Sequence, residues 1–291
     1  MAKFILSAFA DEAAKTLDGQ ISALHRNDIP YLEPRNIRGP ILKKSYSELR
    51  EIRRTLDLNG ISVYSLGSPI GKYAAEKPFE RHWERFLKAL DTCHILGTQR
   101  MRIFSFFTKQ EDLEQNRPII LERLTAMTER AAQEGIILCH ENESDIYGQN
   151  PPEIKDLLEN VPGLRGVFDA SNLLMNDQDS MEGFEATAEK LEYIHMKDCI
   201  SSLRSTIPVG MGDGRYDEIL QKVDAMTDAT VTLTLEPHLF GFAAYKLIDR
   251  HDLKVAMQYA SADEAFDAAA NAVKHTLRKI GFRQEGKIWT K

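Results

Sequence analysis

Four short apolar runs organise the second half of the chain: Ile136-Ile137-Leu138-Cys139-His140-Glu141, Gly166-Val167-Phe168-Asp169, Leu191-Glu192-Tyr193-Ile194-His195 and Val231-Thr232-Leu233-Thr234-Leu235-Glu236. Each run has the length and the branched or aromatic content of a buried parallel strand. A polar loop and then a helical pattern follow each run. Alternation of this kind is typical of a barrel in which parallel strands alternate with helices.

The last residue of each run is of a type that binds metal ions, namely Glu141, Asp169, His195 and Glu236. The C-terminal ends of the strands in such a barrel open onto one face, so the four side chains could converge. A single acid at a strand end is more often a helix cap or a surface charge. A buried acid, however, costs several kcal/mol unless it is paired or bound to a metal. The repetition therefore favours one divalent cation, such as Mn, Co, Mg or Zn.

The first half of the chain shows the same alternation. Four further strands are predicted at residues 4–9, 29–33, 61–66 and 101–107. Ser45 and Glu48 have capping-box spacing, which predicts that a helix begins there. Glycines at three predicted helix-to-strand junctions are expected to have a left-handed backbone: Gly60, Gly97 and Gly135. The count of eight strands predicts a single (β/α)8 TIM barrel domain over residues 1–291.

The composition argues against several classes of protein. With 291 residues, 43% of them hydrophobic, the chain can form one large core. A formal net charge of −7 argues against a nucleic-acid partner, because binding to phosphates needs clustered Lys and Arg. The three cysteines have no CxxC spacing, which is typical of a reducing compartment. The apolar run at 4–10 is too short to span a membrane, so we expect a cytoplasmic enzyme, with a homo-oligomer left open.

Two predicted loops are long, at residues 199–215 and 239–259. Both follow strands that end in a predicted metal ligand, so both would lie on the face where the ligands converge. Loops longer than about 15 residues in a compact domain are usually functional. We therefore expect these two loops to act as lids.

Several segments resemble the signature sequences of xylose isomerase-like (β/α)8 barrels. The clearest are His140-Glu141-Asn142-Glu143, Phe168-Asp169-Ala170-Ser171-Asn172, His195-Met196-Lys197-Asp198 and Leu235-Glu236-Pro237-His238. Similar segments elsewhere extend the resemblance over nearly the whole chain. That superfamily contains sugar isomerases, ketose 3-epimerases and homologues of sugar-phosphate isomerases and epimerases, with the AP endonucleases as distant relatives.

The resemblance implies that Glu141, Asp169, His195 and Glu236 hold one divalent metal ion. In the ketose epimerases, the glutamates that match Glu141 and Glu236 also move protons on opposite faces of an enediolate. The chemistry agrees, because a metal acts as a Lewis acid on the carbonyl oxygen while one carboxylate removes a proton and the second returns it. The expected function is metal-dependent isomerisation or epimerisation of a sugar, sugar phosphate or sugar derivative, with a small-molecule carbohydrate as the partner.

Two positions depart from the pattern of the ketose epimerases. Those enzymes usually have substrate-contacting histidines where this chain has Glu143 and Asn172. A free ketose is therefore less favoured as substrate, and a metal-dependent lyase or dehydratase, or a subunit of the C-glycoside-cleaving type, is the alternative. An AP endonuclease-like nuclease would need more histidine ligands and a basic face. A sugar-binding barrel without catalysis would not need the intact set of four ligands.

Five further residues are candidates for contacts with the substrate: Glu33, Arg35, Lys197, His238 and Arg204. Glu33 and Arg35 are two positions apart on a strand, so both could point into the barrel mouth or form an ion pair with each other. Lys197 and His238 each stand two residues after a predicted ligand and share its strand face, although Lys197 could instead pair with a carboxylate. Arg204 could reach an anionic or polyol substrate from its loop.

Overall fold

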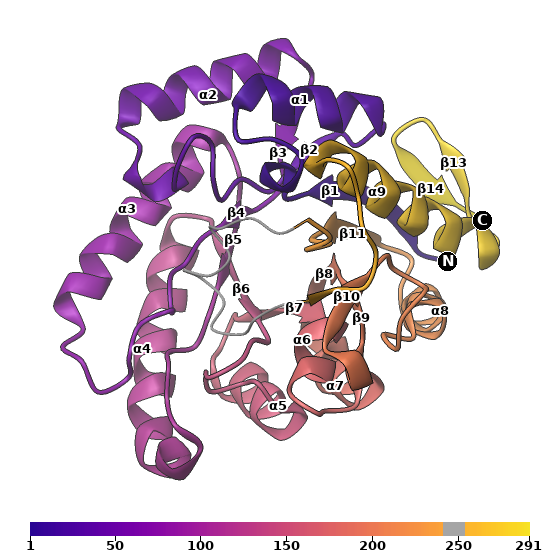
Figure 1. Cartoon of the computed structure of the whole chain (residues 1–291). Coiled ribbons are helices and arrows are strands. Elements are labelled where there is room, and N and C mark those ends of the chain that lie inside the picture. The colour runs from indigo at the N-terminus through magenta and orange to yellow at the C-terminus, as the bar shows by residue number, and fades with distance from the viewer. Residues whose placement is uncertain (241–253) are drawn as a thin grey trace.

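The computed structural model describes residues 1–240 and 254–291. Parallel strands form a nearly closed barrel with helices around it (Figure 1). The strands of the barrel are β1 (Lys3–Ala8), β2 (Tyr31–Leu32), β3 (Ser62–Val63), β4 (Leu66–Gly67), β5 (Arg100–Ile103), β6 (Ile137–Glu141), β7 (Arg165–Asp169), β8 (Leu191–Met196) and β11 (Thr230–Leu235). Their order in the sheet is β3, β2, β1, β11, β8, β7, β6, β5, β4. The predicted (β/α)8 TIM barrel is confirmed.

The α-helices cover the outside of the strands (Figure 1). They are α1 (Leu17–Arg26), α2 (Tyr46–Leu58), α3 (Glu80–Leu96), α4 (Leu113–Gln133), α5 (Pro151–Asn160), α6 (Ala170–Met175), α7 (Ser180–Thr187), α8 (Tyr216–Met226) and α9 (Ala262–Lys279). The capping box predicted for Ser45 and Glu48 is present at the start of α2. Gly60, Gly97 and Gly135 have the predicted positive φ. Among the described helices, none is both long and apolar enough to cross a membrane.

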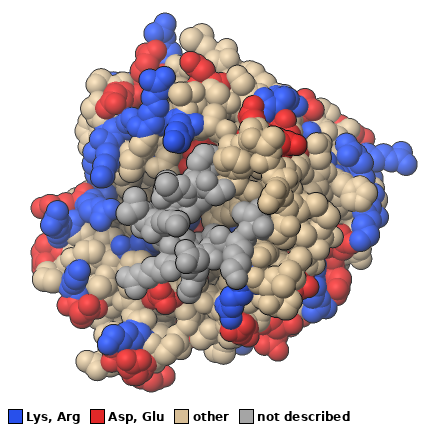
Figure 2. Space-filling model, in the orientation of Figure 1, with Lys and Arg blue, Asp and Glu red and all other residues tan. Residues whose placement is uncertain are grey.

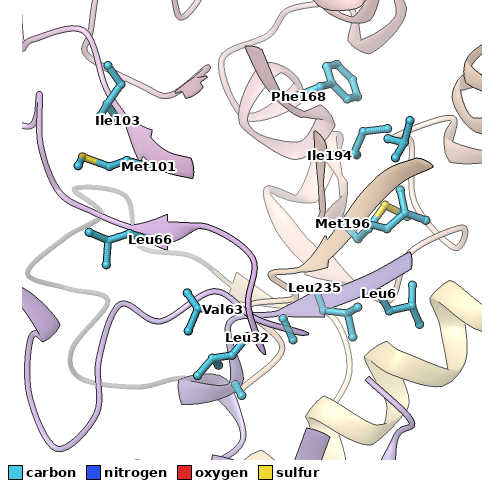
Figure 3. Packing of buried hydrophobic residues seen from close by; sticks show 14 of the residues in the cluster. Leu6, Leu32, Val63, Leu66, Met101, Ile103, Phe168, Ile194, Met196 and Leu235 are labelled. Carbon is cyan, nitrogen blue, oxygen red and sulfur yellow. The ribbon is translucent and has the colours of Figure 1, made fainter. Parts of the chain in front are cut away.

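Buried apolar side chains fill the space between the strands and the helices (Figure 3). Successive residues of a strand point to opposite faces of the sheet. Phe168 of β7 faces outward and meets Phe184 of α7, with ring centroids 5.6 Å apart. Residues of the opposite parity form a separate apolar group, here called the inner cluster: Cys139, Val167 and Tyr193. The strands therefore present one face to the helices and the other to the interior of the barrel.

The predicted strand at 61–66 is divided in the structure. Its first part, β3, pairs with β2, whereas its last residue belongs to β4, which pairs with β5. Tyr64 and Ser65 lie between the two pieces. The ladder of hydrogen bonds opens at this point, although the chain itself is continuous there.

The predicted strand at 101–107 is too long, because its last residues pair with a different segment. The amide of Phe104 donates to the carbonyl of Ile70 (2.8 Å), and the amide of Phe106 donates to the carbonyl of Gly71 (3.0 Å). Phe106 also has a φ of 72°, which is outside the extended region. The barrel strand β5 therefore ends before these residues.

A C-terminal hairpin was not predicted from the sequence. It consists of β13 (Arg283–Glu285) and β14 (Ile288–Thr290). The second strand pairs antiparallel with β1, so that Phe4 stands opposite Trp289. Trp289 is buried. The hairpin therefore extends the sheet beside the first strand and adds an aromatic side chain to the core.

The loop predicted at 199–215 contains regular structure. Two strands, β9 (Asp198–Ile200) and β10 (Ser205–Ile207), form a three-stranded sheet with β12 (Lys254–Val255). The prediction of an open loop is therefore wrong for the residues in β9 and β10. Of the second predicted lid, 239–259, residues 241–253 lie outside the described residues.

The carboxylate of Asp198 holds the glycine-rich part of this segment. It accepts hydrogen bonds from the amides of Gly210 (2.9 Å), Gly212 (3.1 Å) and Gly214 (2.9 Å). A Cβ added at Gly212 would lie 2.4 Å from the carbonyl oxygen of Cys199 and 2.5 Å from Asp198 Oδ1. The backbone can wrap this closely around a carboxylate only because these positions lack side chains.

The segment after β4 closely approaches the backbone of Phe104 at Gly71. Gly71 has a φ of +91°, and a Cβ added there would lie 1.9 Å from the carbonyl oxygen of Phe104. We expect Gly71→Ala to lower the free energy of unfolding by about 3 kcal/mol or more, because the backbone conformation and the overlap are both unfavourable. Urea denaturation followed by circular dichroism measures this loss.

Gly60→Ala is the matched control for Gly71→Ala. Gly60 also has a positive φ, of +66°, but no described heavy atom lies within 4 Å of an added Cβ. We expect Gly60→Ala to lose only about 1–2 kcal/mol, the cost of the left-handed conformation. Equal losses in the two variants would show that the contact with Phe104 does not constrain this position.

Candidate active site

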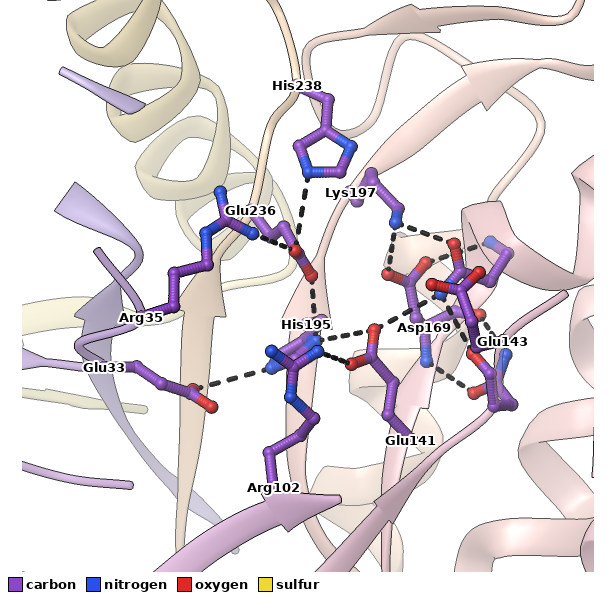
Figure 4. Close-up of polar contacts among 12 residues, drawn as sticks. Glu33, Arg35, Arg102, Glu141, Glu143, Asp169, His195, Lys197, Glu236 and His238 are labelled. Carbon is purple, nitrogen blue, oxygen red and sulfur yellow. Dashed lines mark hydrogen bonds and ion pairs between the residues drawn. The ribbon is translucent and has the colours of Figure 1, made fainter. Parts of the chain in front are cut away.

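Glu141, Asp169, His195 and Glu236 lie together at the C-terminal ends of β6, β7, β8 and β11 (Figure 4). Each offers one nitrogen or oxygen atom, and these four atoms all lie within 4.8 Å of one another. All four side chains are buried, the most exposed being that of Glu236 at 4%. The structure therefore brings together the four residues that the sequence selected as metal ligands, here called the ligand cluster.

The geometry of the strands accounts for this convergence. Glu141, Asp169 and His195 each stand two residues after a member of the inner cluster, so they point to the same face of the sheet. His140 has the opposite parity and points away, with Nε2 2.8 Å from Ser105 Oγ. Burial lowers the pKa of His140 to about 4, so this histidine is neutral at pH 7.

Each glutamate of the ligand cluster uses its two oxygens differently. Glu141 Oε1 lies 3.1 Å from His195 Nδ1, whereas Oε2 accepts a hydrogen bond of 2.5 Å from Arg102. Glu236 Oε2 lies 3.0 Å from the same nitrogen, whereas Oε1 accepts a hydrogen bond of 2.5 Å from Arg35. An arginine therefore fixes the outer oxygen of each glutamate and leaves the inner oxygen facing His195 (Figure 4).

The surrounding cations keep both glutamates ionised. Burial alone would raise the pKa of Glu141, but His195 and Arg102 lower it to about 2. Burial likewise opposes ionisation of Glu236, but Lys197 and His195 hold its pKa well below the usual value. Metal ions bind to the ionised form of a carboxylate. Both glutamates are therefore in the state that a cation requires.

Lys197 connects the ligand cluster to a neighbouring amide. Its Nζ lies 3.0 Å from Asp169 Oδ2 and donates a hydrogen bond of 2.7 Å to Asn172 Oδ1. Burial raises the pKa of Asp169 to about 6, although Lys197 lowers it in part. Burial lowers the pKa of Lys197, but Asp169 and the other carboxylates raise it well above the usual value. The ammonium group therefore stays charged at neutral pH.

The two positions that depart from the ketose epimerases both contact lysines. Glu143 pairs with Lys72 at 3.0 Å. Asn172 accepts from Lys197 and donates to Glu141 Oε1 at 3.2 Å. Glu143 and Asn172 thus hold cationic groups beside the ligand cluster.

Four atoms of the ligand cluster are buried without a well-oriented hydrogen bond from any described residue: Asp169 Oδ2, His195 Nδ1, His195 Nε2 and Glu236 Oε2. Behind the imidazole ring, Glu33 Oε2 lies 3.5 Å from His195 Nε2, and Tyr193 donates to Glu33 Oε1 at 2.7 Å. A carboxylate on that side orients the ring and leaves Nδ1 as the atom that faces the cluster. Three carboxylates and one imidazole arranged in this way fit a divalent cation.

A cavity of about 230 Å³ opens beside the ligand cluster. Glu141 and Glu236 line it, together with three of the residues predicted to contact substrate: Arg35, Lys197 and His238. Its volume lies somewhat below the range for drug-sized small-molecule sites, about 300–1,000 Å³. The cavity therefore suits a compact polar molecule.

The structure does not place the other two predicted substrate contacts at this cavity. Glu33 is fully buried beneath His195, on the side away from the ligand cluster. Arg204 lies on the surface and donates to both carboxylate oxygens of Asp177, at 2.7 and 2.8 Å. Neither is among the described residues that line the cavity.

Arg102 and Lys72 line the cavity but were not selected from the sequence as substrate-binding candidates. Arg102 has a signal that could have identified it, because it interrupts the apolar run Met101-Arg102-Ile103 and is only 7% exposed. A charged residue in a buried strand needs a partner of opposite charge. Lys72 follows a turn, and nothing in its sequence context indicates that Glu143 is its partner.

Comparison with known proteins agrees with the geometry. A sequence profile of the xylose isomerase-like TIM barrel family matches residues 11–262. The chain belongs to this family. The comparison with curated protein sequences gives no match.

Solved structures resemble this xylose isomerase-like barrel over nearly its whole length. A D-psicose 3-epimerase, solved in the presence of D-fructose, has 15% identity, covers 95% of this chain and 99% of its own, and gives a TM-score of 0.72. The probable 3-DHS dehydratase AsbF from Bacillus anthracis has 15% identity, covers 94% of this chain and 99% of its own, and gives a TM-score of 0.69. A xylose isomerase-like barrel protein from Mycobacterium smegmatis, in complex with magnesium, has 13% identity, covers 95% of this chain and 97% of its own, and gives a TM-score of 0.68. At this identity the similarity concerns the fold alone.

Proposed function

We propose that this xylose isomerase-like barrel is a metal-dependent isomerase or epimerase of a sugar, sugar phosphate or sugar derivative, acting as a single domain. The observation that supports this best is the ligand cluster, whose inner atoms converge while arginines hold the outer oxygens of Glu141 and Glu236. The D-psicose 3-epimerase and the magnesium complex on the same fold agree with this choice. The cluster would hold one divalent ion, such as Mn, Co, Mg or Zn.

The two glutamates are suited to move a proton between them. A divalent ion, when bound, would supply a Lewis acid for the carbonyl oxygen and the neighbouring hydroxyl of the substrate. Glu141 and Glu236 come from β6 and β11, which β7 and β8 separate in the sheet. One carboxylate removes the proton next to the carbonyl to give an enediolate, and the other returns a proton. Return to the opposite face inverts the carbon, whereas return to the neighbouring carbon gives an isomer.

Lys197 has a separate task in this scheme. Each glutamate has one oxygen held by an arginine, which makes its carboxylate a weak base. Removal of the proton therefore requires that negative charge on the substrate oxygen be stabilised. The ammonium group of Lys197 stays charged, lines the cavity and is held by Asp169 and Asn172. It can donate a hydrogen bond to that oxygen.

A lyase or dehydratase is the second candidate, and one observation favours it. The cavity is lined by six cationic groups that a neutral ketose does not require: Arg35, Lys43, Lys72, Arg85, Arg102 and Lys197. Such groups can bind an acidic substrate and help a hydroxyl to leave after the same first proton transfer. The two candidates differ in product, since elimination releases water and leaves a double bond.

Deuterium uptake tests the proposed function. The metal-loaded protein is incubated in heavy water with a panel of sugars, sugar acids and sugar phosphates, and the products are followed by NMR and mass spectrometry. We expect deuterium at the carbon next to the carbonyl, no uptake after treatment with a chelator, and recovery when the metal is restored. If no substrate took up deuterium with any of the four metals, the proton-transfer function would be wrong.

A further inference from the structure

Five positively charged side chains line a hollow that adjoins the cavity, here called the basic hollow: Lys43, Lys77, Arg81, Arg85 and Lys88. Lys43 and Arg85 also line the cavity that contains Glu141 and Glu236, so the two spaces share a wall. No Asp or Glu is among the described residues that line the basic hollow. Lys43 and Arg85 thus stand between the cavity of the ligand cluster and the basic hollow.

The local structure places these side chains together. Arg81, Arg85 and Lys88 are spaced by four and three residues on α3, which puts them on one face of the helix. Lys43 ends the short helix η2 (Ile41–Lys43), which packs near α3. Figure 2 shows Lys and Arg side chains gathered at the upper left of this face of the molecule, near α2 and α3.

The charges of the basic hollow are not balanced by the protein. Within the part of the chain that the structure describes, no ion pair is formed by Lys43, Arg81, Arg85 or Lys88. Many other surface cations of this chain do have carboxylate partners, for example Arg26 with Asp263. The whole chain carries a formal charge of −7, so the positive charge of the basic hollow has the opposite sign to the net charge of the protein. Cations gathered in this way attract an anion.

We propose that the basic hollow binds the phosphate group of a phosphorylated sugar whose reacting carbons lie between Glu141 and Glu236. This inference rests on the proposed function and specifies its substrate class. A phosphate monoester carries close to two negative charges and offers several acceptor oxygens, which suits a group of Lys and Arg side chains. Five cations around one hollow offer more donors than a single carboxylate would use. Lys43 and Arg85 line both spaces, so a phosphate that they bind would lie beside the cavity of the ligand cluster.

The first test measures binding without turnover. Inorganic phosphate is titrated into the full-length protein, as isolated and as the double variant Lys43→Gln/Arg85→Gln, by isothermal titration calorimetry at low ionic strength. We expect saturable binding by the natural protein and an affinity at least about tenfold lower in the double variant. The control, Arg54→Gln/Lys155→Gln, removes one Arg and one Lys that are 71% and 64% exposed elsewhere. Its affinity should equal that of the natural protein.

The second test uses pairs of sugars that differ only in a phosphate group. In the heavy-water exchange assay, the ratio of kcat/KM for the phosphorylated member to that for the free sugar should fall at least about tenfold in Lys43→Gln/Arg85→Gln. Absence of saturable phosphate binding, equal weakening by the control variant, or an unchanged ratio would each overturn the inference. Phosphate binding without proton exchange on any sugar would instead contradict the proposed function and leave the phosphate site standing. Circular dichroism confirms that each variant is folded.

Discussion

Glu141→Gln and Glu236→Gln should each lower turnover at least about a hundredfold, which is the usual scale for the loss of a general acid or base. Glutamine keeps the shape of glutamate and one oxygen that can face the ligand cluster, but it cannot accept a proton at neutral pH. In both residues one oxygen is already held by an arginine, and the substitution removes the negative charge of the carboxylate that is expected to accept the proton. Steady-state kinetics on a substrate found by the deuterium assay would measure the loss.

The two variants should differ in what they retain. With one carboxylate intact, an enzyme of this kind can still remove a proton and exchange it with solvent without completing the transfer. We therefore expect one of the two variants to incorporate deuterium into unreacted substrate while forming little product. Which variant does so identifies the glutamate that removes the first proton.

The control for this pair is Glu159→Gln, which changes an exposed glutamate on α5 and should leave turnover unchanged. Metal content must be measured in every variant, so that loss of the cation is not mistaken for loss of a base. If either Glu141→Gln or Glu236→Gln retained full turnover with metal bound, the mechanism with two carboxylates would be wrong. A product lacking one molecule of water would then favour the lyase.

His195→Ala is expected to reduce metal affinity more than Glu33→Gln, which changes a residue behind the imidazole ring. It removes a predicted ligand whose Nδ1 lies about equally far from Glu141 and Glu236. Glu33→Gln keeps all four ligands but replaces the carboxylate that faces His195 Nε2 with a neutral amide. We therefore expect the metal affinity of this variant to fall by about 10–100-fold. Metal content after dialysis and competition with a chelator give both values.

His94→Ala is the matched control for the histidine. His94 lies on α3, its side chain is 50% exposed, and its partner is Glu134. We expect this variant to bind metal as the natural protein does. Metal affinity in His195→Ala equal to that of the control would remove His195 from the set of ligands. Wild-type affinity in Glu33→Gln would show that the carboxylate does not orient the ring.

The parity of residues along the strands could be read from the sequence. The contrast between His140 and Glu141 needed only the two-residue repeat of a strand, and the structure places these side chains on opposite faces of β6. The convergence of the ligand cluster followed from the rule that parallel strands end on one face of a barrel. These features depend on local pattern and topology, which the chain encodes over short stretches.

Features that depend on partners distant in the sequence could not be read in this way. The pairing of Arg102 with Glu141, and of Arg35 with Glu236, is decided by which strands become neighbours and how side chains fill the mouth. Glu33 had the spacing of a residue at the mouth, but its side chain points beneath His195 because Tyr193 donates to it from inside the barrel. Nothing in the sequence around Glu33 indicates that partner.

The position of β1 has a consequence for the order of events during synthesis. This strand meets β2 through two residue pairs, whereas its long partner β11 begins at Thr230 and its other neighbour β14 follows still later, with Trp289 opposite Phe4. Pairing between residues so far apart in the chain is slow, and the apolar strand stays uncovered until then. The first strand therefore lacks its longest partner until residues 230–235 have been synthesised. A truncation that removes residues 230–290 would leave this strand without β11 and without β14.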